Sequence, residues 1–218
     1  MIQRRNSSSK KKVFLKMRTT CAAIATASVL GSFAPALAAT SEGDFAVYGW
    51  GARDCNTIIA ILDGEQAAQA QGQLAEWISG YISGQNRNIE GVYDLTPIKT
   101  HYPLVSLARN VCANNGDQLF ENVVYAIVDT FAAMRLPANS PVVAVSHKGQ
   151  SVTVNESTVL LVQQFLVEAG ILGESAADGQ FGPQTAQALE SWQESANLTV
   201  NGLPDMVTLF LMAQQSNE

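Results

Sequence analysis

The feature that most constrains this chain is a pair of short turn motifs, each followed by a proline. The motifs are Asp178-Gly179 and Asn201-Gly202. Glycine supplies backbone angles that other residues avoid, and Pro183 and Pro204 suit the first turn of a helix. We therefore expect one helix to begin at Pro183 and another at Pro204.

Apolar residues recur at helical spacing on both sides of these turns. Residues 156 to about 169 predict an amphipathic helix, with Asn155 as its N-cap and Gly170 as its C-cap. The two following helices are each expected to direct one apolar face inward. The three sets are Val159, Val162, Leu166 and Ala169; Thr185, Ala188, Leu189 and Trp192; and Val207, Leu211 and Met212. Most of these positions are expected to form core.

The motifs and their spacing together resemble the small three-helix peptidoglycan-binding domain found on many cell-wall hydrolases. The resemblance covers about residues 155–214. It departs in three places: Asn201 replaces the usual Asp, Trp192 replaces the usual Phe, and Asp205 stands where Gly is common. The residues that carry it are Val162-Gln163, Leu166, Gly170, Asp178-Gly179-Gln180-Phe181-Gly182, Thr185, Ala188, Trp192-Gln193, Asn201-Gly202 and Thr208.

The resemblance implies a ligand site for a peptidoglycan stem peptide or glycan in a cleft beside the Asp178–Thr185 turn. The candidate ligand-binding residues are Asp178, Gln180, Phe181, Thr185 and Trp192. Trp192 could equally be core. The same fold could also have lost wall binding and serve as a protein-interaction module.

The N-terminus has the features of a signal peptide. Seven basic residues precede a short apolar run from Cys21 to Phe33, and Ala36-Leu37-Ala38 is a small-x-small cleavage site. The run is shorter than the roughly 20 residues that a membrane span needs. We expect residues 1–38 to be removed, with either Met1 or Met17 as the true start, and the mature protein to be periplasmic with no membrane span.

Removal of the signal peptide makes the chain strongly acidic. Six of the 13 Lys and Arg residues remain against 19 Asp and Glu, a net charge near −13. This balance argues against nucleic acid as a partner, because nucleic acid is bound by clustered cations.

Two cysteines, Cys55 and Cys112, remain in the mature chain and are expected to form one disulfide in an oxidising compartment. The two histidines, His101 and His147, do not pair with cysteine at ligand spacing, so no metal site is expected. No catalytic constellation or cofactor motif is recognised. We expect a non-enzymatic protein in which His147 is exposed and idle, and Glu190 lies on a solvated helix face.

Residues 39–135 are expected to form an all-helical domain held by the disulfide. Four helices are predicted, with Gly- and Asn-rich turns between them and an offset at Pro103. Gly80 and Gly84 lie four residues apart on the second helix, which would permit a close helix crossing. The predicted helices are residues 53–63, 66–83, 96–113 and 119–134.

This part resembles the HdeA/HdeB acid-stress chaperone family and, equally, small immunity proteins that inhibit cell-wall amidases. The resemblance rests on Cys55, the Trp77–Asn86 segment and the Cys112 to Asn115 segment. It implies a protein client or a cell-wall hydrolase as a further partner.

The predicted fold class is therefore all-α with two small helical domains. Residues 136–154 are expected to be a linker with short extended stretches at 142–145 and 152–154, and residues 155–218 a three-helix bundle. The predicted function is to bind peptidoglycan and hold the first domain at the cell wall.

Overall fold

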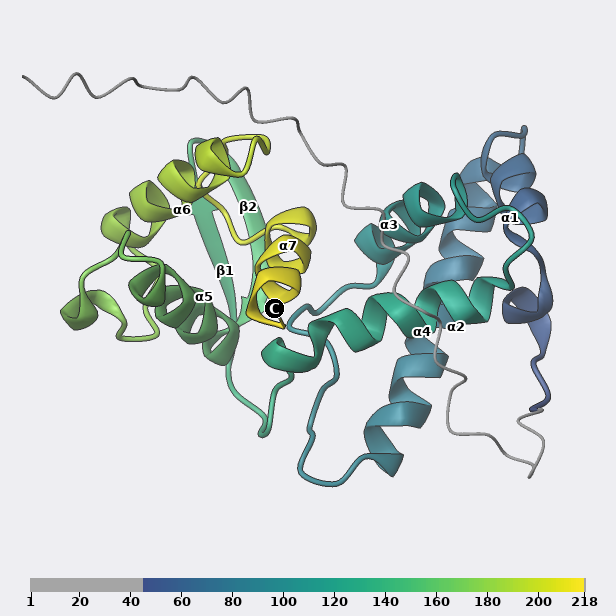
Figure 1. Ribbon diagram of the computed structural model, residues 1–218, viewed down its shortest axis with the longest axis horizontal. Helices are drawn as coiled ribbons and strands as arrows, with labels where there is room; N and C mark the ends of the chain where they lie inside the picture. Colours follow the sequence, from purple (N-terminus) through teal and green to yellow (C-terminus); the bar gives the residue numbers. More distant parts are fainter. Residues whose placement is uncertain (1–44, 218) are drawn as a thin grey trace, which may run out of the picture. The chain divides into compact units, whose positions relative to one another are not determined.

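The computed structural model describes residues 45–217 (Figure 1). The predicted signal peptide, its cleavage site and both candidate start residues lie outside the described residues. Within the described part, no helix has the length and apolar character needed to cross a membrane.

Four helices precede residue 135, as predicted. They are α1 (Cys55–Leu62), α2 (Ala67–Asn88), α3 (Tyr102–Cys112) and α4 (Phe120–Thr130), the last continued by a 3-10 turn, η2 (Phe131–Met134). A short 3-10 turn, η1 (Gly49–Ala52), precedes them. Helix α3 begins at Tyr102 because Pro103 fits the first turn of a helix. Helix α2 runs five residues beyond the predicted end at Ser83.

The first and third helices are joined by the expected disulfide. Cys55 and Cys112 are both fully buried, with a Cα–Cα distance of 5.0 Å. Asp54 caps α1 by accepting a 2.8 Å hydrogen bond from the Thr57 backbone N–H. This hydrogen bond makes the largest contribution to the lowered pKa of the Asp54 carboxyl.

The predicted linker contains a β-hairpin, so the expected all-α class needs correction. Strand β1 (Val142–His147) pairs antiparallel with β2 (Gln150–Asn155) through a two-residue turn. Lys148 and Gly149 both have positive φ, 48° and 78°, as the favoured two-residue hairpin turns require. The two predicted extended stretches are confirmed and lie within these strands. Val145 and Val154 are buried, which anchors one face of the hairpin.

Three helices complete the chain: α5 (Glu156–Glu168), α6 (Pro183–Ser195) and α7 (Met206–Ser216), with a 3-10 turn, η3 (Glu174–Ala176), between the first two. The predicted start of α6 at Pro183 is confirmed. The predicted start of the last helix at Pro204 is wrong, because Asp205 caps α7 by accepting from the Thr208 N–H at 2.9 Å. The expectation that Val207 faces inward is also wrong, since its side chain is exposed.

Helices on the two sides of the hairpin are in contact. Phe131 of η2 packs edge-on against Phe210 of α7, with ring centroids 5.7 Å apart. The Thr158 hydroxyl, fully buried at the start of α5, donates a 2.8 Å hydrogen bond to the Pro97 carbonyl. Residue 98 forms an isolated bridge with Val154 of the hairpin. The hairpin and α5 therefore pack directly against the loop between α2 and α3.

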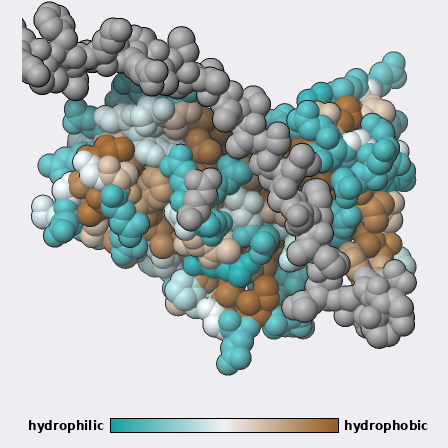
Figure 2. All heavy atoms as spheres, viewed as in Figure 1, coloured by the Kyte–Doolittle hydropathy of each residue, from teal (hydrophilic) through white to brown (hydrophobic). Residues whose placement is uncertain are grey.

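The expected close crossing at Gly80 and Gly84 is absent. A Cβ atom added at either glycine would meet nothing within 4 Å. By contrast, a Cβ at Gly51 would overlap the Trp77 ring, so this glycine is needed where η1 packs on α2. On the face of the molecule shown in Figure 2, apolar residues form separate patches among polar ones.

Candidate functional site

A fully buried glutamine, Gln163 on α5, organises the first turn motif. Its side-chain Nε2 donates to the Gln180 carbonyl at 2.9 Å, to Thr185 Oγ1 at 3.0 Å and to Asp178 Oδ1 at 3.3 Å. Its Oε1 accepts from the Gly179 N–H at 2.7 Å. One side chain thus ties α5 to the turn and to the start of α6.

Asp178 is exposed and also stabilises the turn by itself. Its carboxylate accepts from the Gln180 N–H at 2.8 Å. That hydrogen bond, followed by the one from Gln163, lowers the pKa of the Asp178 carboxyl. Gly179 has a φ of 78°, which suits glycine at this position.

A second glutamine, Gln193 on α6, repeats the arrangement around the second turn. Its Nε2 donates to Asn201 Oδ1 at 2.9 Å, to the Leu203 carbonyl at 3.0 Å and to Thr208 Oγ1 at 2.9 Å. Its Oε1 accepts from the backbone N–H groups of Asn201 and Gly202 at 3.0 and 2.8 Å. We call these two arrangements the Gln163 clamp and the Gln193 clamp. They make α5, α6 and α7 two successive copies of one helix–turn–helix unit.

The five predicted ligand-binding residues differ in accessibility. Asp178 and Gln180 are exposed and Phe181 is half-buried. Thr185 is only 2% exposed and belongs to the Gln163 clamp. Trp192 is 4% exposed and packs edge-on against Phe165, with centroids 5.5 Å apart. The structure therefore brings Asp178, Gln180 and Thr185 together at one turn, and buries Thr185 and Trp192.

A groove with a volume of about 450 Å³ lies between the α5–α6 loop and the exposed side of α6. Its lining contains no charged side chain and none of the five predicted residues. Amides, hydroxyls and small apolar groups face it, from residues Ile171, Leu172, Gly173, Ser175, Ala176, Gln184, Gln187, Ala188 and Ser191. Such a surface is suited to an uncharged polar ligand that is held by hydrogen bonds and by contact with small apolar groups.

The groove was missed from the sequence because its residues are spread over the loop and one helix face. Gln184, Gln187 and Ser191 are spaced three and four apart on α6, so they share one face. This uncharged polar stripe, on a different helix face from the buried Leu189 and Trp192, is the sequence feature that could have predicted the groove.

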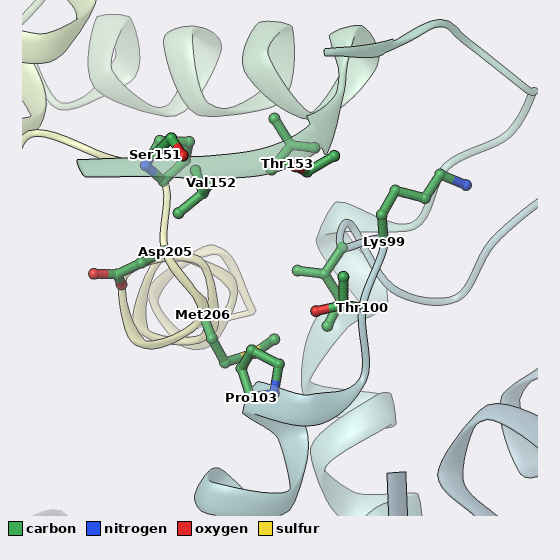
Figure 3. Close-up of a pocket in the computed structure, with 11 residues that line it drawn as sticks. Lys99, Thr100, Pro103, Ser151, Val152, Thr153, Asp205 and Met206 are labelled. Carbon is green, nitrogen blue, oxygen red and sulfur yellow. The ribbon is translucent and has the colours of Figure 1, made fainter. Parts of the chain in front are cut away.

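A second cavity, of about 260 Å³, lies between strand β2, the start of α7 and the segment before α3 (Figure 3). Two charged side chains line it. The Lys99 side chain extends away from Asp205, with its ammonium group 5.7 Å from the Tyr93 ring centroid. Asp205 is occupied by the α7 cap and by a 2.6 Å hydrogen bond from Asn201. The charged groups of this cavity are therefore already engaged, and the groove on α6 is the better candidate site.

His147 is not idle, contrary to the sequence-based prediction. Its Nε2 lies 3.0 Å from Glu190 Oε1, and the same carboxylate pairs with the Lys148 ammonium at 2.5 Å. The hydrogen bond from Lys148, then that from His147, lowers the pKa of the Glu190 carboxyl. Glu190 therefore ties the hairpin turn to α6 and does not lie on a freely solvated face.

Two glutamine-clamped turns thus join the three C-terminal helices, and an uncharged groove lies on α6. Residues 155–212 match the model of a family described as "Putative peptidoglycan binding domain". This match confirms the resemblance of the C-terminal part and supports peptidoglycan binding by it. Neither a curated protein nor a solved structure gives a significant match to the chain. No comparison supports the resemblance of the N-terminal helices to acid-stress chaperones or immunity proteins.

Within residues 45–217, no group of three or more His, Cys, Asp or Glu side chains is arranged to hold a metal ion.

Proposed function

We propose that this protein is exported to the periplasm and binds peptidoglycan through the groove on α6, as a non-enzymatic anchor for its N-terminal helices. The observation that carries the proposal is the family match over residues 155–212. The groove adds chemical support, because its amide and hydroxyl groups can hydrogen-bond to the amides and hydroxyls of a stem peptide or glycan.

The clamps give the groove its position. The Gln163 clamp fixes the turn that joins the two walls, since it connects α5, residues 178–180 and the first turn of α6. We assign to Asp178 and Thr185 a supporting role in this clamp. Gln180 is exposed and Phe181 is half-buried, and neither lines the groove.

The disulfide supports export. Paired cysteines persist in oxidising compartments such as the periplasm and are rare in the cytosol. Cys55 and Cys112 are both fully buried and joined, which leaves neither as a reactive thiol. The predicted signal peptide provides the route.

Binding of soluble muropeptides to the full chain, followed by NMR, tests the groove. Gln187→Ala removes an amide from the lining. Gly173→Leu fills the groove, at a position where a Cβ atom would meet nothing within 4 Å. Gln164→Ala is the matched control, because Gln164 is an exposed glutamine on α5 outside the lining.

We expect muropeptides to change the NMR chemical shifts of groove residues in the wild-type chain and in Gln164→Ala. Gln187→Ala should bind muropeptides more weakly, and Gly173→Leu should not bind them. Equal binding by all four proteins would reject the groove as the site. Shifts caused by glycan fragments but not by stem peptides, or the reverse, would identify the part of peptidoglycan that is recognised.

A further inference from the structure

A third pocket, distinct from the groove on α6 and from the cavity beside β2, lies on the N-terminal helices. Its volume is about 480 Å³, and its walls come from residues 45–48, from α2 and from the start of α4. The Trp77 and Tyr81 rings on α2 stack with centroids 5.6 Å apart and both line it. The Trp77 indole is fixed by a 3.1 Å hydrogen bond to the Tyr48 carbonyl. The pocket thus has a preformed aromatic wall.

A buried carboxyl group, that of Glu121 on α4, also lines this pocket. Glu121 is only 6% exposed, and its Oε2 has no hydrogen-bond partner among the described residues. Buried side-chain oxygen atoms rarely lack a hydrogen-bond partner. Burial raises the pKa of the Glu121 carboxyl, and a hydrogen bond with Tyr81 lowers it by less. The group is therefore held at a cost that a positively charged partner would remove.

One of the residues that line the pocket is a glycine, Gly80. Gly80 lies within helix α2, where glycine is less favourable than alanine. No neighbour requires the missing side chain, since a Cβ at Gly80 would meet nothing within 4 Å. Gly80 lines the pocket, whereas Gly84, one turn further along α2, does not. A larger side chain at Gly80 would project into space that the pocket now leaves empty.

The charge of the lining favours one class of ligand. Among the described residues that line the pocket, the carboxylates are those of Glu76 and Glu121, and there is no Lys, Arg or His. Aromatic faces beside carboxylates attract organic cations, because the ring face is electronegative and the carboxylate only accepts hydrogen bonds when ionised.

We propose that this pocket binds a primary ammonium group, with Glu121 as the ion-pairing acceptor and the Trp77 and Tyr81 rings as its walls. The ammonium can come from a lysine side chain of a protein partner or from a free amino group on a wall peptide. The site is separate from the groove on α6 and does not depend on the function proposed for that groove.

The test uses the full chain and two small probes, Nα-acetyl-lysine methylamide and its Nε-acetylated, neutral counterpart. Binding is followed by NMR through the Trp77 indole resonance. The variants are Glu121→Gln, which removes the charge but keeps the shape, and Gly80→Leu, which fills the pocket. Gly84→Leu is the matched control, because it adds the same side chain to the same helix at an open position outside the pocket.

We expect the amine to shift the Trp77 resonance and its neutral counterpart to have no effect. Glu121→Gln should weaken binding about tenfold, the difference between a charge-assisted and a neutral hydrogen bond. Gly80→Leu should abolish binding, and Gly84→Leu should match the wild type. If Gly80→Leu fails to fold, the Glu121→Gln result decides.

Two outcomes would overturn the proposal: no response to the amine in the wild-type chain, or equal responses to the amine and its neutral counterpart. Once amine binding is shown, muropeptides with free or acetylated stem amines are compared with a lysine-containing peptide. This comparison distinguishes a wall source of the ammonium group from a protein source.

Discussion

Replacing the two clamp glutamines with leucine should destabilise the protein by different amounts. Both side chains are fully buried, and leucine is of similar size and apolar. The gain from burying an apolar side chain is therefore nearly the same in both variants, and the difference between them reports the hydrogen-bonding groups left behind.

Gln193→Leu strands two buried groups, the Gly202 N–H and the Thr208 hydroxyl, because the Leu203 carbonyl still accepts a 2.9 Å hydrogen bond from the Asp205 N–H. An unsatisfied buried group costs about 1–3 kcal/mol, so we expect a loss of about 3 kcal/mol after the apolar gain. Gln163→Leu strands one such group, the Thr185 hydroxyl, because Gln180 is exposed and Gly179 is partly exposed. Water can satisfy those two, and we expect a loss of about 2 kcal/mol.

Urea unfolding of the full chain, followed by circular dichroism, measures both losses. Gln164→Ala, an exposed glutamine on the same helix as Gln163, is the control and should change stability by less than about 0.5 kcal/mol. Equal losses in the two leucine variants, or a larger loss for Gln163→Leu, would refute the argument that buried partners determine the cost.

Three further predictions concern the disulfide and two carboxyl groups. Reduction of the Cys55–Cys112 bond, which joins residues 57 positions apart, should lower the free energy of unfolding by about 4 kcal/mol, measured by urea unfolding with and without reductant. The folded-state pKa of Glu190 is lowered, so its ionised carboxylate stabilises the protein above pH 4.5, the ordinary pKa, and this stability is lost as pH falls through the folded pKa. The Tm of Glu190→Gln should therefore lie below that of the wild type at neutral pH and approach it in acid. A Tm difference that does not change with pH would contradict this. The pKa of Glu121 is raised, which has the opposite effect: the free energy of unfolding falls as pH rises above 4.5, because the buried carboxyl ionises. The Tm of Glu121→Gln should therefore rise relative to that of the wild type between acidic and neutral pH. A constant Tm difference would count against this.

Much of the helical pattern was predictable because it follows from local chemistry. The turn at Asp178-Gly179 and the start of α6 at Pro183 depend on residues within a few positions of each other. The disulfide was predictable because only two cysteines follow the predicted signal peptide. The start of α7 was misplaced by two residues because Asp205 competes with Pro204 for the helix boundary, and the cap geometry favours Asp205.

The long-range polar contacts were not predictable from periodicity. Helical patterns assign polar residues to the surface, yet Gln163 follows Val159 by four residues and Gln193 follows Leu189 by four, which places both on buried faces. The contact of His147 with Glu190 joins residues 43 apart in sequence and depends on the hairpin. Glu121 precedes the buried Val124 by three residues and therefore lies on the same helix face. Its burial was not predicted, because only apolar residues were taken to mark that face.

The proposed function depends on the binding of peptidoglycan by residues 155–212 through the groove on α6. Co-sedimentation of the full chain with purified insoluble peptidoglycan, at low and high salt, tests this binding. We predict that the wild-type chain and Gln164→Ala pellet with the wall at both salt concentrations, because the groove has no charged lining, and that Gly173→Leu stays in the supernatant. A folded wild-type chain that stays in the supernatant, or a Gly173→Leu variant that pellets like the wild type, would contradict the claim.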